Sequence, residues 1–386
     1  MIFFYKALAQ IGPTICKVEN YILVFISKLL WHKVHLNFEP KNILIHRVGK
    51  IGDIVCALPA IRAIRIRWPN SHIVLLTNDS GANDQGIKKL LLNLSWIDEI
   101  IFYQPSKLKQ LRVLLSLTGV LREMKIDFWL SLSQDLTCFS YELRNMIFAK
   151  YVNSKNGFGF RTNTFKIFSF FQSNYLKHKY EVKRLQGIVK EIGITNDCLD
   201  YGLEDLKIAN KKNEPLEIAI TERKKLLVIA PGGSRITNRW PLVRFEEIVK
   251  RWVDDGGYVV MIGGGQDYTL AEEIIKKIPV RSVTNLCGIT TLEESLQLIR
   301  VCKIFLSNDS GPIHLAAAYK IPMVAIFSAR DFPGKWFPIH EKSSILRIST
   351  NCSPCYLEVC NRNNLCLSEI SVDDVWNAMR KVESIG

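Results

Sequence analysis

The chain has 386 residues, of which 48% are hydrophobic and 23% are charged, and its formal net charge is +14. This length and balance predict a globular protein with two domains, and the absence of repeats and low-complexity runs excludes repeat and disordered classes. The excess of Lys and Arg predicts an acidic partner. Because these residues are spread over the chain without a nucleic-acid-binding motif, they favour an anionic membrane or a phosphorylated substrate over nucleic acid.

Residues 1–40 are predicted to form a basic amphipathic segment. No basic start and no small-residue cleavage site are present, so no export signal is expected. The apolar runs 21–26 and 29–31 are too short to span a membrane. On a helical period, one face would carry Ile22, Phe25, Ile26 and Leu29, and another Lys28, His32 and His35. A helix on a membrane surface and a helix packed on the protein's own surface both fit this pattern.

Strand and helix patterns alternate in the first half of the chain. Apolar runs predict strands near residues 43–48, 72–77, 99–103 and 127–132, and helical periods predict helices near 54–67, 84–93 and 106–124. The crossovers of a parallel sheet require such alternation. Residues 134–180 have no clear period, and the aromatic run 165–171 is interpreted as core. The polar residues near 205–224 predict a linker.

The turn after the first predicted strand carries the first candidate site. Gly49, Lys50 and Gly52 separate this strand from a helix, and Asp53 falls in the first helical turn. The helix dipole favours a carboxylate there. Open α/β sheets also place their chemistry at the carboxyl ends of strands. Asp53 therefore has two open roles, a helix cap and a reactive group.

Two glycine-bearing turns follow predicted strands in the second half, whose strands are expected at 225–230, 258–262, 304–306 and 323–327. Pro231-Gly232-Gly233-Ser234 predicts backbone N–H groups that bind a diphosphate, with Arg235 and Arg239 as nearby cations. Gly263-Gly264-Gly265 lacks the Gly-x-Gly-x-x-Gly spacing of dinucleotide sites, which argues against a dehydrogenase. A turn beside a nucleotide and a simple tight loop both remain open for it.

The segment from Asn308 to Ala318 is the most informative part of the sequence. Ser310-Gly311-Pro312 supplies a hydroxyl, a residue without bulk and a fixed φ at a helix start, where free N–H groups face an anion. Asp309 is placed to bind a sugar hydroxyl, and His314 to face the same ligand one turn later. The alternative is an ordinary strand–helix connection capped by Asp309 or Ser310.

Taken in chain order, these motifs resemble glycosyltransferase family 9, the ADP-heptose:lipopolysaccharide heptosyltransferases. The first half of the resemblance rests on Arg47-x-Gly49-x-Ile51-Gly52-Asp53, Leu58-Pro59-Ala60 and Trp68-Pro69. The second half rests on Pro231-Gly232-Gly233-Ser234, Arg239-Trp240-Pro241, Gly263-Gly264, Leu286-x-Gly288, residues 308–318 and the late cysteines. The resemblance begins near residue 42 and is weak between about 134 and 215. Several motifs in one order are more specific than any single glycine pattern.

The resemblance implies an α/β fold of the GT-B type, in which two Rossmann-like, doubly wound domains face each other across a cleft. Residues 41–215 would form the acceptor-binding domain. Residues 216–386 would form the domain that binds a nucleotide-sugar donor, and its C-terminal helix would pack back on the first domain.

The resemblance also implies inverting transfer of heptose from ADP-heptose, or of another sugar, to lipopolysaccharide core or a related bacterial surface glycan. Asp53 would be the general base. An anionic glycolipid acceptor would bind at His46, Arg47, Lys50 and Gly52. The donor would bind at Gly232, Gly233, Ser234, Arg235, Asn238, Arg239, Gly263, Gly264, Asn285, Asn308, Asp309, Ser310, Gly311 and His314. No metal or other cofactor is expected, since the chain has no Asp-x-Asp pair for Mg²⁺. The protein is expected in the cytoplasm, peripheral on the inner face of the inner membrane.

One position departs from the family pattern. Asn238 stands where the family has a Lys that meets the donor phosphate, and an amide cannot neutralise a leaving diphosphate. Either Arg235 or Arg239 takes over this role, or the donor contact is altered. A catalytically impaired binding protein with this fold, and another nucleotide-sugar enzyme such as an epimerase, are the alternative functions. Asp53 argues against the first, and the lack of a recognisable carboxylate–His constellation argues against the second. The sequence does not predict an oligomeric state.

Four of the ten cysteines are clustered near the end of the chain. They are Cys352, Cys355, Cys360 and Cys366. This spacing fits a zinc site or disulfides, but a reducing compartment keeps thiols free. Structural thiols are therefore preferred to a bound metal.

Overall fold

The computed structural model divides into two compact units, Met1–Gly202 and Leu203–Gly386. It describes residues 2–31, 39–79, 85–134, 137–162, 164–166, 172–174, 180–195, 199–204, 206, 221 and 225–385. The predicted domain boundary at 215/216 therefore falls inside the second unit. Most of the predicted linker and of the aromatic run 165–171 lies outside the described residues.

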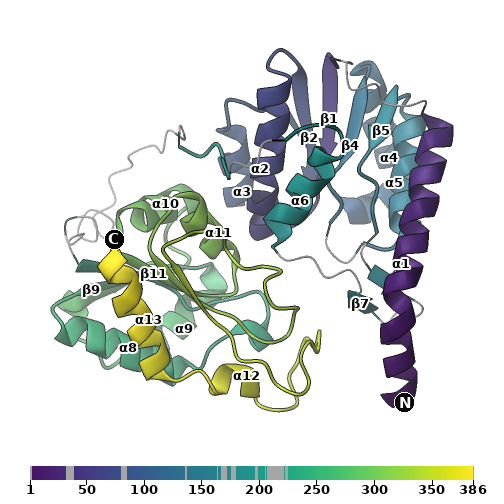
Figure 1. Ribbon diagram of the computed structural model, residues 1–386. Helices are drawn as coiled ribbons and strands as arrows, with labels where there is room; N and C mark the ends of the chain where they lie inside the picture. Colours follow the sequence, from purple (N-terminus) through teal and green to yellow (C-terminus); the bar gives the residue numbers. More distant parts are fainter. Residues whose placement is uncertain are drawn as a thin grey trace. The chain divides into compact units, whose positions relative to one another are not determined.

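The first unit is built on a five-stranded parallel sheet (Figure 1). Its strands are β1 (Asn42–His46), β2 (His72–Asn78), β3 (Glu99–Tyr103), β4 (Phe128–Ser131) and β5 (Asn156–Phe158). They lie in the order β3-β2-β1-β4-β5, so the order reverses at β1 and β4. The carboxyl ends of these two strands flank the switch point, where doubly wound sheets place their ligands.

Helices connect these strands as the alternating pattern predicted. They are α2 (Ile51–Arg67), α3 (Gln85–Leu92), the 3-10 turn η2 (Pro105–Lys109), α4 (Leu111–Glu123), α5 (Phe139–Tyr151) and α6 (Glu181–Lys190). The stretch 134–180, which the sequence left unassigned, contains α5, β5 and the antiparallel pair β6 (Thr164–Lys166) and β7 (Gln172–Asn174).

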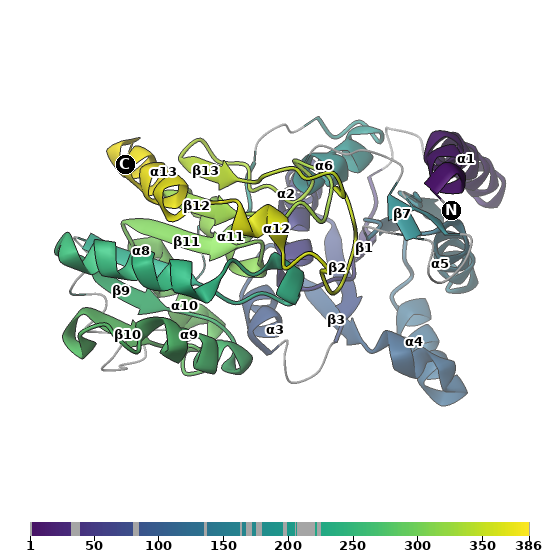
Figure 2. The same ribbon diagram turned by 90° about the horizontal axis from the view of Figure 1, so that it is seen from below.

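Helix α1 (Ile2–Leu30) packs along α5, and both views place the two helices side by side (Figures 1 and 2). Leu23 and Trp31 enter the core that α4, α5 and one face of the sheet form around Trp129. The Trp31 indole N–H donates to the Ser154 carbonyl at 2.9 Å. A Cβ at Gly157 would lie 2.5 Å from the Trp31 ring, so the missing side chain makes room for the indole.

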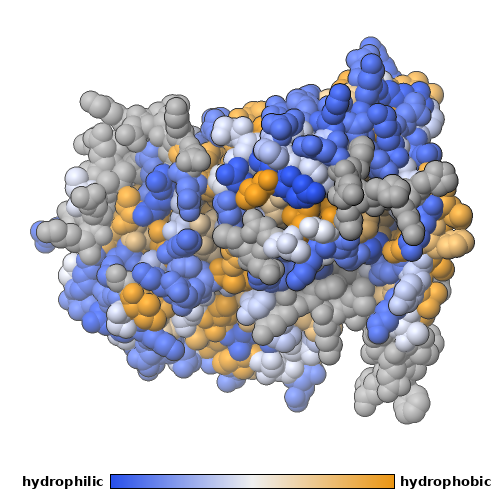
Figure 3. All heavy atoms as spheres, turned by 45° about the horizontal axis from the view of Figure 1, so that its top comes forward, coloured by the Kyte–Doolittle hydropathy of each residue, from blue (hydrophilic) through white to orange (hydrophobic). Residues whose placement is uncertain are grey.

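The outer face of α1 is exposed. Its exposed apolar side chains are Val18, Tyr21, Ile22, Phe25 and Leu29, and in Figure 3 orange side chains lie among blue ones on the right, where α1 lies. Ile26, which the sequence placed with them, packs inward against the core instead. The helix thus has one face that packs on the protein and one that does not. In the part of the chain that the structure describes, no helix is long and apolar enough to span a membrane.

The second unit has a six-stranded parallel sheet in the order β10-β9-β8-β11-β12-β13. Its strands are β8 (Leu226–Ala230), β9 (Tyr258–Met261), β10 (Val283–Asn285), β11 (Ile304–Asn308), β12 (Met323–Ile326) and β13 (Ser343–Leu346). Its connecting elements are η4 (Ile236–Asn238), α8 (Leu242–Asp254), η5 (Gly265–Asp267), α9 (Tyr268–Ile275), η6 (Val280–Ser282), α10 (Leu292–Val301), α11 (Gly311–Ala318), α12 (Leu365–Ser368) and α13 (Val372–Ile385).

Side chains of β8 alternate between two cores of this unit. Leu227 and Ile229 pack with α8, α9 and α13, whereas Leu226 and Val228 pack with α10 and α11. Helix α13 buries Val375 and Met379 in the first of these cores. This helix therefore packs in the core of its own unit, and its packing on the first domain stays a prediction. The prediction of two doubly wound α/β units is confirmed.

Candidate functional site

The turn between β1 and α2 holds Asp53 in a fixed place. The Lys50 N–H donates to Asp53 Oδ2 at 2.8 Å, and the Gly49 N–H donates to Asn78 Oδ1 at 2.7 Å. A Cβ at Gly49 would lie 2.2 Å from the Cβ of Asp53, so only glycine lets the carboxylate fold back over the turn. The Asp53 side chain remains 20% exposed. The carboxylate thus caps the helix and still reaches solvent, while its second possible role, as a reactive group, stays a prediction.

Arg47 lies buried beneath this turn. Nε and Nη2 donate to the Asp53 carbonyl at 3.3 and 3.0 Å, and Nη1 donates to the carbonyls of Leu132 and Ser133 at 3.3 and 2.9 Å. Nη2 also donates to Glu181 Oε1 at 3.3 Å. All five donors of the guanidinium are therefore engaged within the protein. This placement corrects the expectation that Arg47 binds the acceptor, because it has neither exposure nor a spare donor.

Arg47 affects the protonation of Asp53. Burial raises the pKa of the Asp53 carboxyl, and the positive charge of Arg47, with its Nη2 at 3.9 Å from Oδ1, lowers it in part. The Lys50 N–H also lowers this pKa, and Glu181 raises it. Asp53 thus has a raised pKa, which suits a group that accepts a proton near neutral pH.

The other residues predicted to bind the acceptor, Lys50, Gly52 and His46, differ in their exposure. Lys50 is exposed and Gly52 is half-buried beside Asp53. His46 is 6% exposed, and its Nε2 lies 2.9 Å from the Tyr103 hydroxyl. Burial, together with the positive charges of Arg144 and Arg47, lowers the pKa of His46 to about 4, so the ring is neutral at pH 7. His46 therefore carries no charge with which to bind an anionic acceptor, which corrects that part of its predicted role.

In the second unit, Asn308 holds the glycine loop that follows β8 by hydrogen bonds. Its side chain is fully buried, Nδ2 donates to the Pro231 carbonyl at 2.6 Å, and Oδ1 accepts the Trp240 N–H at 3.1 Å. Arg239 Nη2 donates to the Gly233 carbonyl at 2.7 Å from the same side. Both residues thus shape the loop through its backbone. Ser234 is exposed at the loop's end.

Two of the predicted glycines share one neighbour, Asp267. A Cβ at Gly232 would lie 2.3 Å from its Cγ, and a Cβ at Gly263 would lie 2.8 Å from its Oδ2. The Gly264 N–H donates to Oδ2 at 3.0 Å, while Oδ1 has no hydrogen-bond partner among the described residues and lies 4.0 Å from Arg239 Nη2. Asp267 was not predicted as a site residue. The signal that could have identified it is the presence of two glycine turns after neighbouring parallel strands, because such turns meet at one edge of the sheet.

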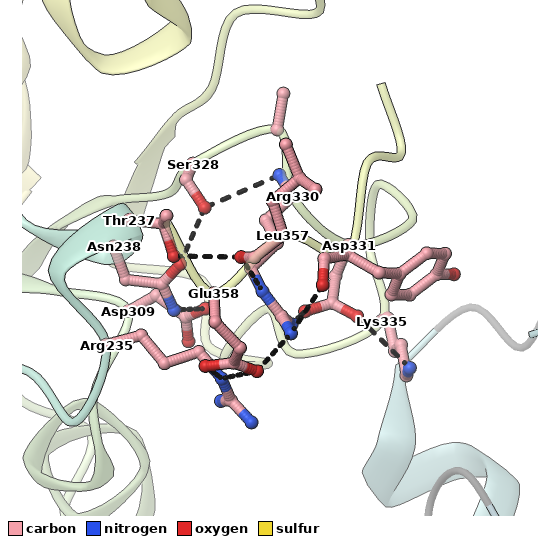
Figure 4. A network of polar contacts seen from close by, with 12 residues as sticks. Arg235, Thr237, Asn238, Asp309, Ser328, Arg330, Asp331, Lys335, Leu357 and Glu358 are labelled. Atoms are coloured by element: carbon pink, nitrogen blue, oxygen red, sulfur yellow. Dashed lines mark hydrogen bonds and ion pairs between the residues drawn. The ribbon is translucent and has the colours of Figure 1, made fainter. Parts of the chain in front are cut away.

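Asn238 connects two groups in the interior of this unit (Figure 4). Its Nδ2 donates to Asp309 Oδ2 at 2.9 Å, and its Oδ1 accepts the Ser328 hydroxyl at 2.7 Å. The side chain is 5% exposed. A Lys at this position could not make both hydrogen bonds, because an amide can both donate and accept and an ammonium can only donate.

Three cations, Arg235, Arg330 and Lys335, belong to the same network of polar contacts (Figure 4). Arg235 Nε lies 3.1 Å from Glu358 Oε1, which also accepts from Arg330 Nη2 at 2.9 Å. Burial, with the nearby Asp331 carboxylate, raises the pKa of Asp309 to about 7, and Arg235, Arg330 and Lys335 oppose this rise. The sequence analysis missed Arg330 and Lys335, since they lie outside the motifs. Both are nearly buried, at 6% and 3% exposed.

The other predicted donor residues make local contacts. The Ser310 hydroxyl lies 2.9 Å from that of Ser307 just before α11, and Gly311 begins this helix with its amide at the N-terminus. His314 is 5% exposed inside the helix. Asn285 donates to Glu272 Oε1 at 2.7 Å, and Gly264 is exposed.

The late cysteines are free thiols, each partly buried. Burial and the thiols of Cys355, Cys360 and Cys352 raise the pKa of Cys366. Within the described part of the chain, no group of three or more His, Cys, Asp or Glu side chains is arranged to hold a metal ion.

Comparisons with known proteins find relatives that are named heptosyltransferases. The chain is 24% identical over 338 residues to lipooligosaccharide heptosyltransferase 2 of Campylobacter jejuni, covering 86% of this chain and 96% of that protein. It is 30% identical over 140 residues to lipopolysaccharide heptosyltransferase 2 of Escherichia coli, which is 35% of this chain and 39% of that one.

Among solved structures, E. coli ADP-heptose lps heptosyltransferase II has a TM-score of 0.64 at 20% identity, over 89% of this chain and 99% of the other. E. coli heptosyltransferase WaaC with ADP has a TM-score of 0.62 at 14% identity, over 88% and 99%. At such identities the likeness shows a shared fold, which confirms the GT-B prediction. The model of glycosyltransferase family 9 (heptosyltransferase) matches residues 143–365.

Proposed function

This chain belongs to glycosyltransferase family 9 and is a glycosyltransferase, and on that premise we propose that it moves heptose from ADP-heptose to the core of a lipopolysaccharide or lipooligosaccharide. The relatives named as heptosyltransferases of these glycans support both the sugar and the acceptor class. The acceptor is an anionic glycolipid, and the protein acts at the cytoplasmic face of the inner membrane.

The observation that carries this proposal is the setting of Asp53. Its carboxylate is fixed by the Lys50 N–H and supported from below by the buried Arg47, yet it is 20% exposed at the carboxyl end of β1. Burial raises its pKa. A carboxylate with these properties is a general base, and we assign to it the proton of the attacking acceptor hydroxyl. Attack by that hydroxyl on the anomeric carbon displaces ADP with inversion.

The leaving diphosphate develops negative charge, which the second unit is equipped to stabilise. The N-terminal amides of α11 and the loop 231–234 supply N–H groups at the ends of β11 and β8. Arg235 and Arg239 supply positive charge beside that loop, at 39% and 24% side-chain exposure. These groups perform the task that Asn238 cannot. We propose that they act without a metal ion.

Replacement of Asp53 by Asn tests the proposal. Asp53→Asn keeps the size of the side chain and most of its capping ability, so the fold and ADP binding persist while transfer to a core acceptor falls by about 10²–10⁴-fold, the usual range for a general base. Transfer would be followed by mass spectrometry and ADP binding by calorimetry. Near-normal turnover would refute the assignment. If the wild-type protein bound ADP but transferred nothing, it would be an impaired binding protein instead.

A further inference from the structure

A cavity of about 400 Å³ lies in the first unit, apart from the turn that holds Asp53. It is enclosed by the carboxyl ends of β1 and β3, by β4, and by helices α4 and α5, and we call it the α4–α5 cavity. Its volume is within the range of roughly 300–1,000 Å³ that is common for small-molecule sites. Every residue that lines it belongs to this unit.

Most of the cavity wall is apolar. Leu114 and Leu117 of α4 face it on one side, Phe148 of α5 on another, and Trp129 of β4 from the sheet. Several of the polar groups that line it already have partners, since the neutral His46 is hydrogen-bonded to the Tyr103 hydroxyl and Asn145 Nδ2 donates to Glu142 Oε1 at 3.5 Å. A sugar would need many hydrogen-bond partners for its hydroxyls, and this wall offers few. The lining therefore favours a hydrocarbon chain.

The charged groups at the cavity are positive. Arg144 and Lys109 line it, and none of the described residues lining it is Asp or Glu. Arg144 lies over the Tyr141 ring at 4.7 Å and is exposed. The molecule that fits here has an apolar chain and an anionic group, because only an anion complements this charge.

The outer surface next to the cavity is also apolar. Leu111 and Leu115 of α4 are 68% and 52% exposed, and Ile147 and Tyr151 of α5 are 58% and 50% exposed. Ile147 and Tyr151 line the cavity as well, so the apolar wall continues to the surface. Helix α1, whose outer face carries exposed apolar side chains, packs on α5. A chain held at a lipid surface would thus meet exposed apolar side chains next to the cavity.

We propose that the α4–α5 cavity binds an acyl chain of an anionic lipid, with the anionic group at Arg144 and Lys109. On the proposed function, this lipid is the glycolipid acceptor itself, and the cavity selects an acylated acceptor over a free sugar chain. The proposal rests on the proposed function only for the identity of the lipid.

Binding of dodecyl phosphate below its critical micelle concentration tests the cavity directly. We expect saturable, one-site binding to the wild-type protein in calorimetry. Leu117→Trp fills the cavity and should weaken binding at least tenfold. The matched control is Leu115→Trp, on the same helix but outside the cavity, which should leave binding unchanged. Equal affinity of Leu117→Trp and the wild type would overturn the proposal.

A second pair of variants tests the charge and does not depend on core packing. Arg144→Gln should weaken dodecyl phosphate binding about tenfold and leave the binding of neutral dodecanol unchanged. Arg112→Gln, an exposed Arg on α4 that does not line the cavity, is the control. Loss of binding in both Arg variants, or in neither, would contradict the assignment of the anionic end.

Transfer assays then separate this proposal from the proposed function. With an acylated acceptor, Leu117→Trp should raise KM at least tenfold, while KM for the deacylated core sugar stays unchanged. An equal rise with both acceptors would mean that the cavity binds sugar and would refute the acyl chain. If the wild type used neither acceptor, the proposed function would fail, and dodecyl phosphate binding would still decide the cavity.

Discussion

Arg47 is a buried charged side chain whose N–H groups all donate to other groups of the protein. Its positive charge lowers the pKa that burial raises at Asp53, and its five N–H groups hold the Asp53 backbone, the end of β4 and Glu181 in one arrangement. We regard it as a positioning residue. It fixes the proposed base without touching a substrate.

Replacement of Arg47 should therefore change a pH profile as well as stability. Arg47→Gln removes the charge that lowers the pKa of Asp53, so the acidic limb of the pH profile of kcat/KM should move to higher pH. Removing one partner of a buried pair also costs about 3–5 kcal/mol of unfolding free energy. Arg47→Lys, which keeps the charge, should shift the limb less.

Arg67→Gln is the control for this prediction, because it removes an equal charge from the exposed end of α2. It should leave both the profile and the melting temperature as they are. A folded Arg47→Gln protein with an unshifted acidic limb would show that Arg47 has no influence on the base.

Glu142 provides a pH-dependent contribution to stability. It is fully buried in α5, and burial raises its pKa to about 8, although Ser131, Ser133 and Arg184 lower it in part. In the unfolded chain its pKa is about 4.3. The folded state therefore binds more protons between about pH 4.3 and 8, and the free energy of unfolding falls as the pH rises through this window.

Glu142→Gln should remove this dependence. The melting temperature of the variant relative to the wild type should rise steadily from pH 5 to pH 8.5, as followed by circular dichroism. Glu123→Gln, at an exposed position on α4, is the comparison and should run parallel to the wild type. A parallel curve for Glu142→Gln would mean that this carboxyl is ionised in the fold.

At the scale of elements, α1 has a packed face and an exposed face, so packing on the protein is confirmed and contact with a membrane stays a prediction for the exposed face. Leu23 and Trp31 are part of the core of the first unit, while Phe25 and Leu29 are exposed at 62% and 66%. Deleting residues 1–38 would therefore remove core side chains together with the outer face. Single substitutions distinguish the two faces, and a truncation does not.

Substitutions on the two faces of α1 should affect different properties, stability on the packed face and membrane binding on the exposed face. Leu23→Ala should lower the unfolding free energy by about 2–5 kcal/mol, the range for buried Leu. Phe25→Ser with Leu29→Ser should leave the melting temperature unchanged and reduce binding to anionic vesicles, because each exposed side chain that enters the lipid contributes roughly 1.5–3 kcal/mol. Unchanged vesicle flotation of this double variant would remove α1 from the proposed membrane contact.

At the scale of the whole molecule, the net charge of +14 predicts salt-sensitive membrane binding. Attraction to anionic lipid is screened within about 8–10 Å near physiological salt. Co-sedimentation with anionic vesicles should therefore decrease between low and high salt, and neutral vesicles should bind weakly throughout. Salt-independent binding would show that apolar contacts alone hold the protein at the membrane.

Much of this fold could be predicted because its strands are local patterns. Apolar runs such as 43–48 and 225–230 coincide with β1 and β8, since a buried parallel strand needs only a short continuous apolar stretch. Residues 134–180 could not be assigned because their order depends on distant partners. Asn20, for example, accepts the Thr162 N–H across 142 residues.

The loops of the candidate site could be predicted from the sequence, whereas the buried side chains that support them could not. Gly49, Gly232 and Gly263 were predicted from the sequence as loop residues, and in the structure each lies tightly against Asp53 or Asp267. Arg47 was predicted to bind the acceptor, and its burial was not predicted because Arg is rarely buried. Its burial depends on Glu181, which follows 134 residues later. The hydrogen bond of Asn238 with Ser328 could not be predicted either, because the two residues are 90 positions apart.

The docking of α1 has a consequence for the timing of synthesis. The residues of this helix leave the ribosome well before the groups that hold it, because Ser154, Gly157 and Thr162 follow the residues they bind by 123, 130 and 142 positions. At about 5–20 residues per second, this interval lasts roughly 6–28 s. Throughout it, the face of the helix that is later buried lacks these partners. Docking of the helix therefore has to wait for the synthesis of residues 154–162.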